Sequence, residues 1–350
     1  MRVLVIGPDI EKSKGGMSTV IKEINEDKDL RSNVEIDIFS SYVDGNKAYI
    51  LLYSFIAIVK FILFYRNYDV YHIHCASYGS TFRKGIYIYL VKLFNKKAIL
   101  HIHGAEYLVF FEKSKHKNLI IKILNKADLV IALSNEWKRN FEKTFHIENC
   151  IAIENGIDVE KYSSCSGVKK NNYNIVMLGR LGTRKGTYDL INTIERVVTH
   201  FPNLKCYMAG DGEINKCITL IEKKNLKKNV FCLGWVNLTR KTEILKDSNI
   251  LVLPSYNEGL PMAILEGMAS GKAIISTNVG AIPEVISSEK NGILIHPGDI
   301  EALENAIIRL FTDYNLVKEM SKNNRKKIIE EFSTKKMHEE ILKCYRKVFI

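Results

Sequence analysis

The stretch "NILVLPSYNEGLPMAILEGMASGKAIIST", from Asn249 to Thr277, contains one complete strand–helix–strand unit. A short apolar run is followed by a polar loop, a helical segment and a second apolar run. Pro261 lies where the helix would begin, a position that favours proline, and Gly271 lies where it would end. Two apolar strands joined by a helix predict parallel neighbours in a sheet covered by helices on both faces.

The same alternation extends along the whole chain in two rounds. Apolar runs that predict strands lie at residues 3–6, 33–40, 68–74, 97–104 and 127–134, and then at 173–180, 203–210, 229–235, 248–255, 272–277 and 291–297. A polar stretch, "SSCSGVKKNN" (163–172), separates the rounds and is the best candidate for a linker. We therefore expect an α/β protein with two Rossmann-like domains, 1–165 and 166–332.

Composition places the chain among ordinary globular proteins. Of its 350 residues 46% are hydrophobic and 26% are charged, and a chain of this length favours two domains over one. Its seven cysteines are scattered without a CxxC pair, which indicates buried thiols in a reducing compartment. The chain opens directly on the apolar run "MRVLVIG", so we expect a cytoplasmic protein without a signal peptide.

The net charge of +12 is concentrated in one region. Residues 83–126 contain ten Lys or Arg against two acids, a local charge of 10 − 2 = +8. Three interpretations stay open: solvated helix faces, an anionic ligand, or an anionic membrane surface. No nucleic-acid-binding motif accompanies the charge, so we expect no nucleic-acid partner.

The segment "AYILLYSFIAIVKFILFY" (48–65) is apolar for 18 residues and carries one charge, Lys60. Its length reaches the lower limit for a membrane span. It also lies between two expected strands, where a doubly wound domain needs a crossover helix. The alternatives are therefore a span, a buried crossover helix, or an interfacial helix whose apolar face is exposed.

Two glycine-containing loops can approach phosphate groups. The first, with Gly15 and Gly16, precedes a helix, but it lacks the GxGxxG pattern of dinucleotide-binding proteins. The second, "GRLGTRKG", places Arg180 and Lys185 after a strand, at the sheet edge where open parallel sheets bind ligands. Arginine offers a bidentate fork and lysine a point charge, a combination suited to a diphosphate. Two solvated loop cations are the alternative.

The opening stretch adds two carboxylates to this edge. Glu258 precedes the short helix and Glu266 lies inside it, while the helix amides near Gly259 and Leu260 favour an anion. Carboxylates beside an anion site are suited to accept hydrogen bonds from sugar hydroxyls.

Six short motifs occur in a fixed order: "GGM", "HG", "GRL…KG", "AGDG", "LGW" and "EGLPMAILE". Together they resemble the retaining nucleotide-sugar glycosyltransferases of the GT-B fold, family 4 type. The resemblance covers nearly the whole chain and is strongest from 174 to 297. It implies two Rossmann-like domains facing each other across a donor-binding cleft, with a C-terminal helix, about 333–350, that returns to the first domain.

The resemblance also implies roles for individual residues. Gly16, with Gly15 beside it, resembles the loop glycine that approaches the donor diphosphate. Arg180 and Lys185 resemble the pair that binds the diphosphate and stabilises the leaving group. Leu260, next to Gly259, would offer a backbone N–H to the diphosphate.

The remaining site residues follow from the same resemblance. Glu258 resembles the residue that faces the donor sugar, and Glu266 resembles the carboxylate that binds the ribose. The loops after Gly210 and Gly234 resemble those that hold the base. His103 resembles the histidine on the acceptor side of the donor sugar.

The histidines admit a second interpretation. "HIH" at 72–74 and again at 101–103 places four imidazoles on two strands, close to Glu106, where a transition metal is conceivable. No ligand set of known spacing is complete. We therefore expect neither a metal nor another cofactor.

The expected activity is that of a retaining hexosyltransferase. It would move a sugar from a nucleoside-diphosphate sugar, with a UDP-sugar as the expected donor, to a hydroxyl of a glycan or lipid-linked acceptor in bacterial surface polysaccharide or glycolipid synthesis. Peripheral contact with the inner face of the plasma membrane would accompany a lipid-linked acceptor. Two alternatives stay open: a UDP-sugar epimerase of the same architecture, and a non-catalytic nucleotide-sugar-binding protein.

Overall fold

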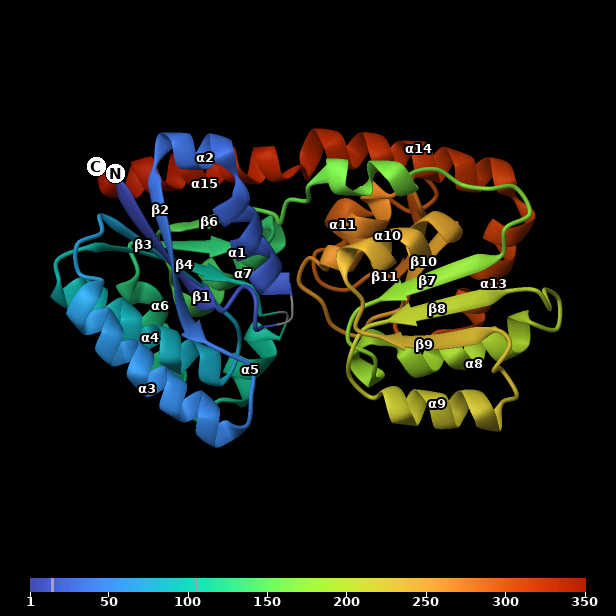
Figure 1. Cartoon of the computed structure of the whole chain (residues 1–350), viewed down its shortest axis with the longest axis horizontal. Coiled ribbons are helices and arrows are strands. Elements are labelled where there is room, and N and C mark those ends of the chain that lie inside the picture. Colours follow the sequence, from blue (N-terminus) through green and yellow to red (C-terminus); the bar gives the residue numbers. More distant parts are fainter. Residues whose placement is uncertain (14–15, 105) are drawn as a thin grey trace. The chain divides into compact units, whose positions relative to one another are not determined.

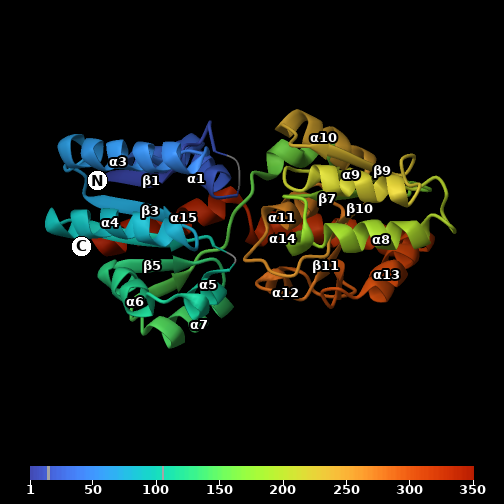
Figure 2. The same ribbon diagram turned by 90° about the horizontal axis from the view of Figure 1, so that it is seen from below.

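The computed structural model describes residues 1–13, 16–104 and 106–350. The chain forms two compact units, one made of Met1–Gly156 with Thr334–Ile350 and the other of Ile157–Ser333. Each unit consists of a parallel sheet between layers of helices, as Figures 1 and 2 show. The expected α/β class with two Rossmann-like sheets is confirmed.

The sheet of the first unit has six strands in the order β2-β1-β3-β4-β5-β6. The strands are β1 (Arg2–Pro8), β2 (Glu35–Tyr42), β3 (Val70–Cys75), β4 (Lys97–Ile102), β5 (Leu129–Ala132) and β6 (Cys150–Ala152). All neighbours pair in parallel. The sequence pattern predicts the first five strands and misses β6, because three residues at a sheet edge leave no periodic signal.

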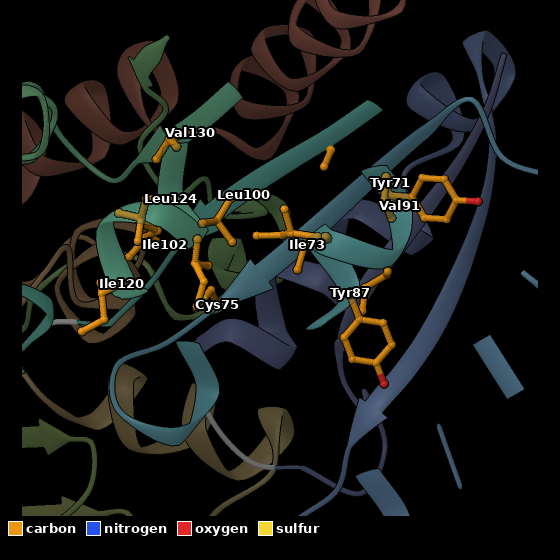
Figure 3. Packing of buried hydrophobic residues seen from close by; sticks show 14 of the residues in the cluster. Tyr71, Ile73, Cys75, Tyr87, Val91, Leu100, Ile102, Ile120, Leu124 and Val130 are labelled. Carbon is orange, nitrogen blue, oxygen red and sulfur yellow. The ribbon is translucent and has the colours of Figure 1, made fainter. Parts of the chain in front are cut away.

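Helices cover both faces of this sheet. They are α1 (Gly16–Glu26), α2 (Lys28–Asn33), α3 (Lys47–Phe64), α4 (Gly79–Leu93), α5 (Tyr107–Lys113), α6 (Lys117–Lys126), α7 (Asn135–Phe145) and α15 (Thr334–Phe349). Side chains alternate along β3, so that Tyr71, Ile73 and Cys75 share a buried apolar cluster with α3, α4 and α6 (Figure 3). His72 points to the opposite face, where it contacts Tyr345 of α15.

The sheet of the second unit also has six parallel strands, in the order β12-β11-β10-β7-β8-β9. The strands are β7 (Asn174–Leu178), β8 (Lys205–Ala209), β9 (Val230–Gly234), β10 (Ile250–Leu253), β11 (Ala273–Thr277) and β12 (Gly292–Ile295). The helices are α8 (Thr187–Val197), α9 (Ile214–Lys223), α10 (Leu238–Asp247), α11 (Met262–Ala269), α12 (Ile282–Val285), α13 (Ile300–Thr312) and α14 (Tyr314–Glu331), with 3-10 turns at Val159–Cys165 and Thr183–Lys185.

Each sheet has a point where the strand order reverses. In the first unit β1 continues to β2 on one side and has β3 on the other. In the second unit β7 continues to β8 on one side and has β10 on the other. The loops that leave the two central strands diverge at such a point, and ligands of open α/β sheets bind there.

The division between the units lies after Gly156, before the boundary expected at residue 165. The 3-10 turn Val159–Cys165 accounts for the difference, because Tyr162 makes a hydrogen bond to Glu266 of α11 and Cys165 one to Ser270, directly after that helix. The polar stretch at 163–172 is therefore attached to the second unit. The C-terminal helix α15 belongs to the first unit.

Candidate functional site

The loops after β7 and β10 meet at the reversal point of the second sheet. Lys185 ends the 3-10 turn after β7, and its Nζ lies 2.5 Å from Oε1 of Glu258 in the loop after β10. Gly186, with φ of 68°, permits this approach, since a Cβ there would lie 2.0 Å from the carbonyl oxygen of Pro254. The geometry thus joins a predicted diphosphate ligand to a predicted sugar ligand.

The Lys185–Glu258 pair is buried. The side chain of Lys185 is 11% exposed and that of Glu258 is 5% exposed. The same Glu258 oxygen accepts a hydrogen bond of 2.7 Å from Ser255 Oγ, and Arg184 Nη1 lies 3.7 Å from the other oxygen. Burial lowers the pKa of Lys185, while the charge of Glu258 opposes that shift. The buried ammonium group of Lys185 therefore depends on the carboxylate of Glu258 to stay charged.

Glu266 has a separate set of partners. It lies in α11, is buried, and its Oε1 accepts hydrogen bonds from Lys241 Nζ at 2.6 Å and Tyr162 Oη at 3.1 Å. Lys241 belongs to α10 and Tyr162 to the 3-10 turn that begins the second unit. Neither partner was predicted from the sequence. Glu258 and Glu266 therefore each pair with their own lysine and share no hydrogen bond that would make them an acid–base couple.

Arg180 follows β7, as predicted, but it does not share a partner with Lys185. Its side chain is 69% exposed, and Nη1 lies 3.3 Å from Oδ2 of Asp211 in the loop after β8. The two predicted diphosphate cations thus take different carboxylates, one exposed and one buried. Arg180 is the one that can reorient at small cost, because an exposed pair contributes little stability.

Glycines let the loops after β7, β8 and β9 approach one another. Gly210 has φ of 156°, and a Cβ there would lie 1.9 Å from the carbonyl oxygen of Gly179. Its amide donates to the carbonyl of Gly234, which itself adopts a left-handed φ of 67°. The backbone conformation at this sheet edge therefore favours glycine at both of these predicted site positions.

The start of α11 lies close to its predicted position. The helix begins at Met262, with Pro261 as the residue before it, and Gly271 follows its end with φ of 59°. The carbonyl of Gly259 accepts a hydrogen bond from Ala281, and the Leu260 side chain is buried. The loop that carries Glu258 is thereby attached to the segment after β11.

In the first unit, the predicted phosphate loop follows β1 at the reversal point of that sheet. Gly16 is the first residue of α1, whereas Gly15 lies outside the described residues. A Cβ at Gly7, within β1, would lie 2.0 Å from the Ile21 side chain, so α1 packs closely on the strand that leads into this loop.

Four histidines, three of them in β3 and β4 and the fourth directly after β4, form a connected group on one side of the same sheet. His103 Nε2 lies 2.8 Å from Nδ1 of His74, and His72 Nε2 lies 3.2 Å from Nδ1 of His101. The His72 Nδ1 atom is 2.8 Å from Tyr345 Oη. His103, the predicted acceptor-side residue, is thus held by His74 on the neighbouring strand.

Burial favours the neutral form of these imidazoles over the imidazolium cation, and the neutral form is also the one that binds metals. Nitrogen atoms of His72, His74 and His101 lie within 4.8 Å of one another, but within the described part of the chain no carboxylate joins them to balance a cation. Burial lowers the pKa of His72 and of His103 to about 3, and the pKa values of His74 and His101 also lie well below the usual range. We assign no metal to these residues.

Family models of glycosyltransferases match both parts of the chain. Residues 19–161 match the model described as Glycosyltransferase Family 4, and residues 158–327 match Glycosyl transferases group 1. The protein belongs to the GT-B glycosyltransferases of family 4 type. The predicted resemblance is confirmed.

Curated relatives of this glycosyltransferase agree with that assignment. The Escherichia coli "UDP-Gal:alpha-D-GlcNAc-diphosphoundecaprenol alpha-1,3-galactosyltransferase" is 29% identical over 83% of this chain and 78% of its own length. The Staphylococcus aureus "Poly(ribitol-phosphate) alpha-N-acetylglucosaminyltransferase" is 27% identical over 71% of this chain and 50% of its own length.

Solved structures confirm the fold of this glycosyltransferase. Sucrose-phosphate synthase from Thermosynechococcus elongatus superposes with a TM-score of 0.83 at 19% identity and covers 99% of both chains. Anabaena HepE in complex with UDP-glucose superposes with a TM-score of 0.80 at 18% identity, over 99% of this chain and 100% of its own. At these identities the likeness establishes the GT-B fold.

Proposed function

We propose that this glycosyltransferase moves a hexose from a nucleoside-diphosphate sugar, with UDP as the expected nucleotide, to a hydroxyl of a glycan or lipid-linked acceptor. The observation that carries the proposal is the buried Lys185–Glu258 pair at the reversal point of the second sheet. One member suits a diphosphate oxygen and the other a sugar hydroxyl, so a donor can engage both where they meet.

The donor would use the loops around this pair. Lys185 and Arg180 bind the diphosphate, with the backbone amides at Gly259 and Leu260 beside them. In the bound state Arg180 exchanges Asp211 for the diphosphate, which its 69% exposed side chain permits. These groups stabilise the charge that develops on the leaving diphosphate.

The remaining groups would position the rest of the donor. Glu258 accepts a hydrogen bond from the donor sugar and Glu266 from the ribose. Gly210 and Gly234 would shape the loops beside the base, and the roles given above to Gly15 and Gly16 of the first unit stay predictions. The acceptor-side role of His103 also stays a prediction; burial lowers the pKa of this imidazole, which favours its neutral form.

The transfer would proceed with retention at the anomeric carbon. The bond between that carbon and the diphosphate oxygen breaks, and the acceptor oxygen bonds to the same face of the sugar. The acceptor proton passes to the departing diphosphate, so no protein base is consumed. The names of the Escherichia coli and Staphylococcus aureus relatives specify α-linked products, which fits retention from an α-linked donor.

A lipid-linked acceptor is the expected class, in the synthesis of a bacterial surface glycan or glycolipid. The name of the Escherichia coli relative specifies a sugar on diphosphoundecaprenol. The basic segment 83–126 of the first unit provides charge complementary to such a diphosphate.

A panel of UDP-, GDP- and ADP-sugars tests this function. Mass spectrometry of the products should show release of nucleoside diphosphate that depends on an acceptor such as a GlcNAc-diphospho-polyprenol analogue. Lys185→Ala should lower turnover by roughly 100-fold or more, since it removes leaving-group stabilisation. Lys227→Ala, at a 68% exposed lysine of the same unit, is the matched control and should leave turnover unchanged.

Two results would contradict the proposal. Interconversion of the sugar without loss of the nucleotide would indicate an epimerase. Binding of a nucleotide sugar without turnover, for every donor and acceptor of the panel, would indicate a non-catalytic binding protein.

A further inference from the structure

Helix α3 is apolar on its outer face as well as on its inner face. Its inner face is ordinary core: Phe61 is fully buried and makes edge contacts with Tyr71 and Tyr87, with ring centroids 5.7 and 5.0 Å apart. The outer face of a helix in this position is usually polar. Here it carries large apolar side chains that are between 40% and 74% exposed: Leu51, Leu52, Phe55, Ile56, Val59, Leu63 and Phe64.

Helix α4 extends this surface. Ile86, Tyr89 and Leu93 follow one another at helical spacing and are 43%, 43% and 74% exposed. The two helices are joined near their C-terminal ends, where the ring of Phe94 stacks on that of Phe61 at 6.2 Å. We call the exposed apolar residues of α3 and α4 together the apolar face. Ten large apolar side chains on two adjoining helices form a much larger cluster than the scattered apolar residues of a typical surface.

The surroundings of the apolar face are basic. Helices α3, α4 and α6 contain no aspartate or glutamate, and their exposed or half-buried cations are Lys60, Arg83, Lys117, Lys122 and Lys126. Lys84 is buried, and Lys92 pairs with Asp128, so neither is counted with them. Helix α6 packs against α4 and exposes its Lys122 together with Leu119. Directly after α3, the exposed Arg66 lies with its guanidinium 5.4 Å from the ring centroid of Phe94.

Apolar side chains beside cations, with no acid among these helices, match a surface that is apolar inside and negative outside. We propose that the apolar face docks the protein on an anionic lipid bilayer, with α3 lying at the boundary between headgroups and acyl chains. Leu51, Phe55 and Leu63 enter the acyl region, while Lys60 and Arg66 remain among the phosphates. No helix in the described part of the chain is long and apolar enough to cross a membrane.

The cations around the apolar face favour an anionic bilayer over a second copy of the chain as its partner. A second copy of the chain would bring the same cations against one another, because contacts between identical patches repeat every charge. An anionic bilayer neutralises them. The inference goes beyond the proposed function, since docking requires neither a donor nor sugar transfer.

Co-sedimentation of the full chain with vesicles tests the proposal. The protein should bind vesicles of phosphatidylglycerol mixed with phosphatidylcholine, and bind vesicles of phosphatidylcholine alone more weakly. Leu51→Gln/Phe55→Gln/Leu63→Gln should lower the partition coefficient by about tenfold per residue. Lys60→Gln/Lys122→Gln should lower it by roughly fivefold per lysine on anionic vesicles alone, an effect that salt should remove.

A matched control replaces three exposed apolar residues of the second unit, in Ile218→Gln/Leu238→Gln/Ile329→Gln. Its partition should equal that of the unchanged protein. Circular dichroism and thermal unfolding should show that both triple variants are folded, and release of nucleotide in the presence of a water-soluble acceptor should be equal in both. That last measurement separates failure of the transferase proposal from failure of the docking proposal.

Two outcomes would overturn the docking proposal. One is equal vesicle binding by the unchanged protein and the Leu51/Phe55/Leu63 variant, or no binding by either. The other is a dimer in sedimentation equilibrium that this variant abolishes while vesicle binding stays absent, which would assign the apolar face to contacts between copies.

Discussion

At the scale of single residues, the most informative feature is the buried ion pair between Lys185 and Glu258. The free energy needed to remove both charges from water can exceed the attraction between them, so a buried ion pair is a weak source of stability. Its position at the reversal point of the sheet, beside Arg184 and Ser255, explains its presence better. The pair holds two groups ready for a ligand that carries both negative charge and hydroxyls.

Replacing one or both members separates structure from function. Lys185→Met leaves Glu258 buried without its main partner and should lower the free energy of unfolding by about 3 kcal/mol. Lys185→Met/Glu258→Gln should restore most of that stability, because no charge remains unpaired, yet turnover should stay at the level of the single variant. Denaturant unfolding and donor turnover measure the two effects. Recovery of turnover in the double variant would show that the pair is structural.

The candidate site was only partly predictable at this scale. Glu258 and Lys185 stand in short motifs beside glycine and proline, so local sequence identifies them. Local sequence does not identify the partners of Glu266. Lys241 lies 25 residues before it and Tyr162 lies 104 residues before it, on elements that only the folded sheet brings together. That Arg180 and Lys185 pair with different carboxylates could not be predicted either, because Asp211, the partner of Arg180, follows a different strand.

At the scale of elements, strands β3 and β4 place four imidazoles on one face: His72, His74 and His101 are buried, and His103, directly after β4, is half-buried. Burial lowers the pKa values of His72 and His103 to about 3, against about 6.5 in an unfolded chain. Between these pH values the unfolded chain binds more protons than the folded one. The stability contributed by each neutral imidazole is therefore complete above pH 6.5 and falls as the pH is lowered toward 3.

The expected slope is about 1.4 kcal/mol per pH unit for each histidine that stays neutral, measured as the free energy of unfolding of the first unit below pH 6.5. His101→Gln removes one titrating group and should reduce the slope by the contribution of one proton, about 1.4 kcal/mol per pH unit. His116→Gln, at an exposed position, is the control and should keep it. A slope that His101→Gln leaves unchanged would mean that the group is protonated when folded.

The elements themselves were largely predictable, with exceptions that have physical causes. Apolar runs identified eleven of the twelve strands, because strands buried on both faces are continuous in sequence. For α3, composition alone left burial and exposure open, since both faces of the helix are apolar. Only the packing of Phe61 against Tyr71 and Tyr87 settles which face is inner.

At the scale of the whole molecule, the first unit is completed by the end of the chain. Helix α15 lies on the histidine face of the first sheet and buries six residues: Met337, His338, Ile341, Cys344, Tyr345 and Val348. Tyr345 Oη lies 2.8 Å from His72, and His338 Nδ1 lies 2.6 Å from Oδ2 of Asp27. Residues 1–156 therefore lack part of their own core, whereas the second unit is continuous in sequence.

Ending the chain at Ser333 should consequently affect the two units differently. Loss of α15 removes apolar burial worth on the order of 10 kcal/mol, which is comparable to the whole stability of a domain. Hydrogen exchange followed by mass spectrometry should show β1–β5 unprotected, while β7–β11 keep their protection. The full chain with Lys343→Ala, at a 69% exposed lysine of α15, is the control and should exchange like the unchanged protein. Protected strands in the truncated first unit would show that its sheet is stable without the helix, and that α15 serves the histidines on that face instead of the fold.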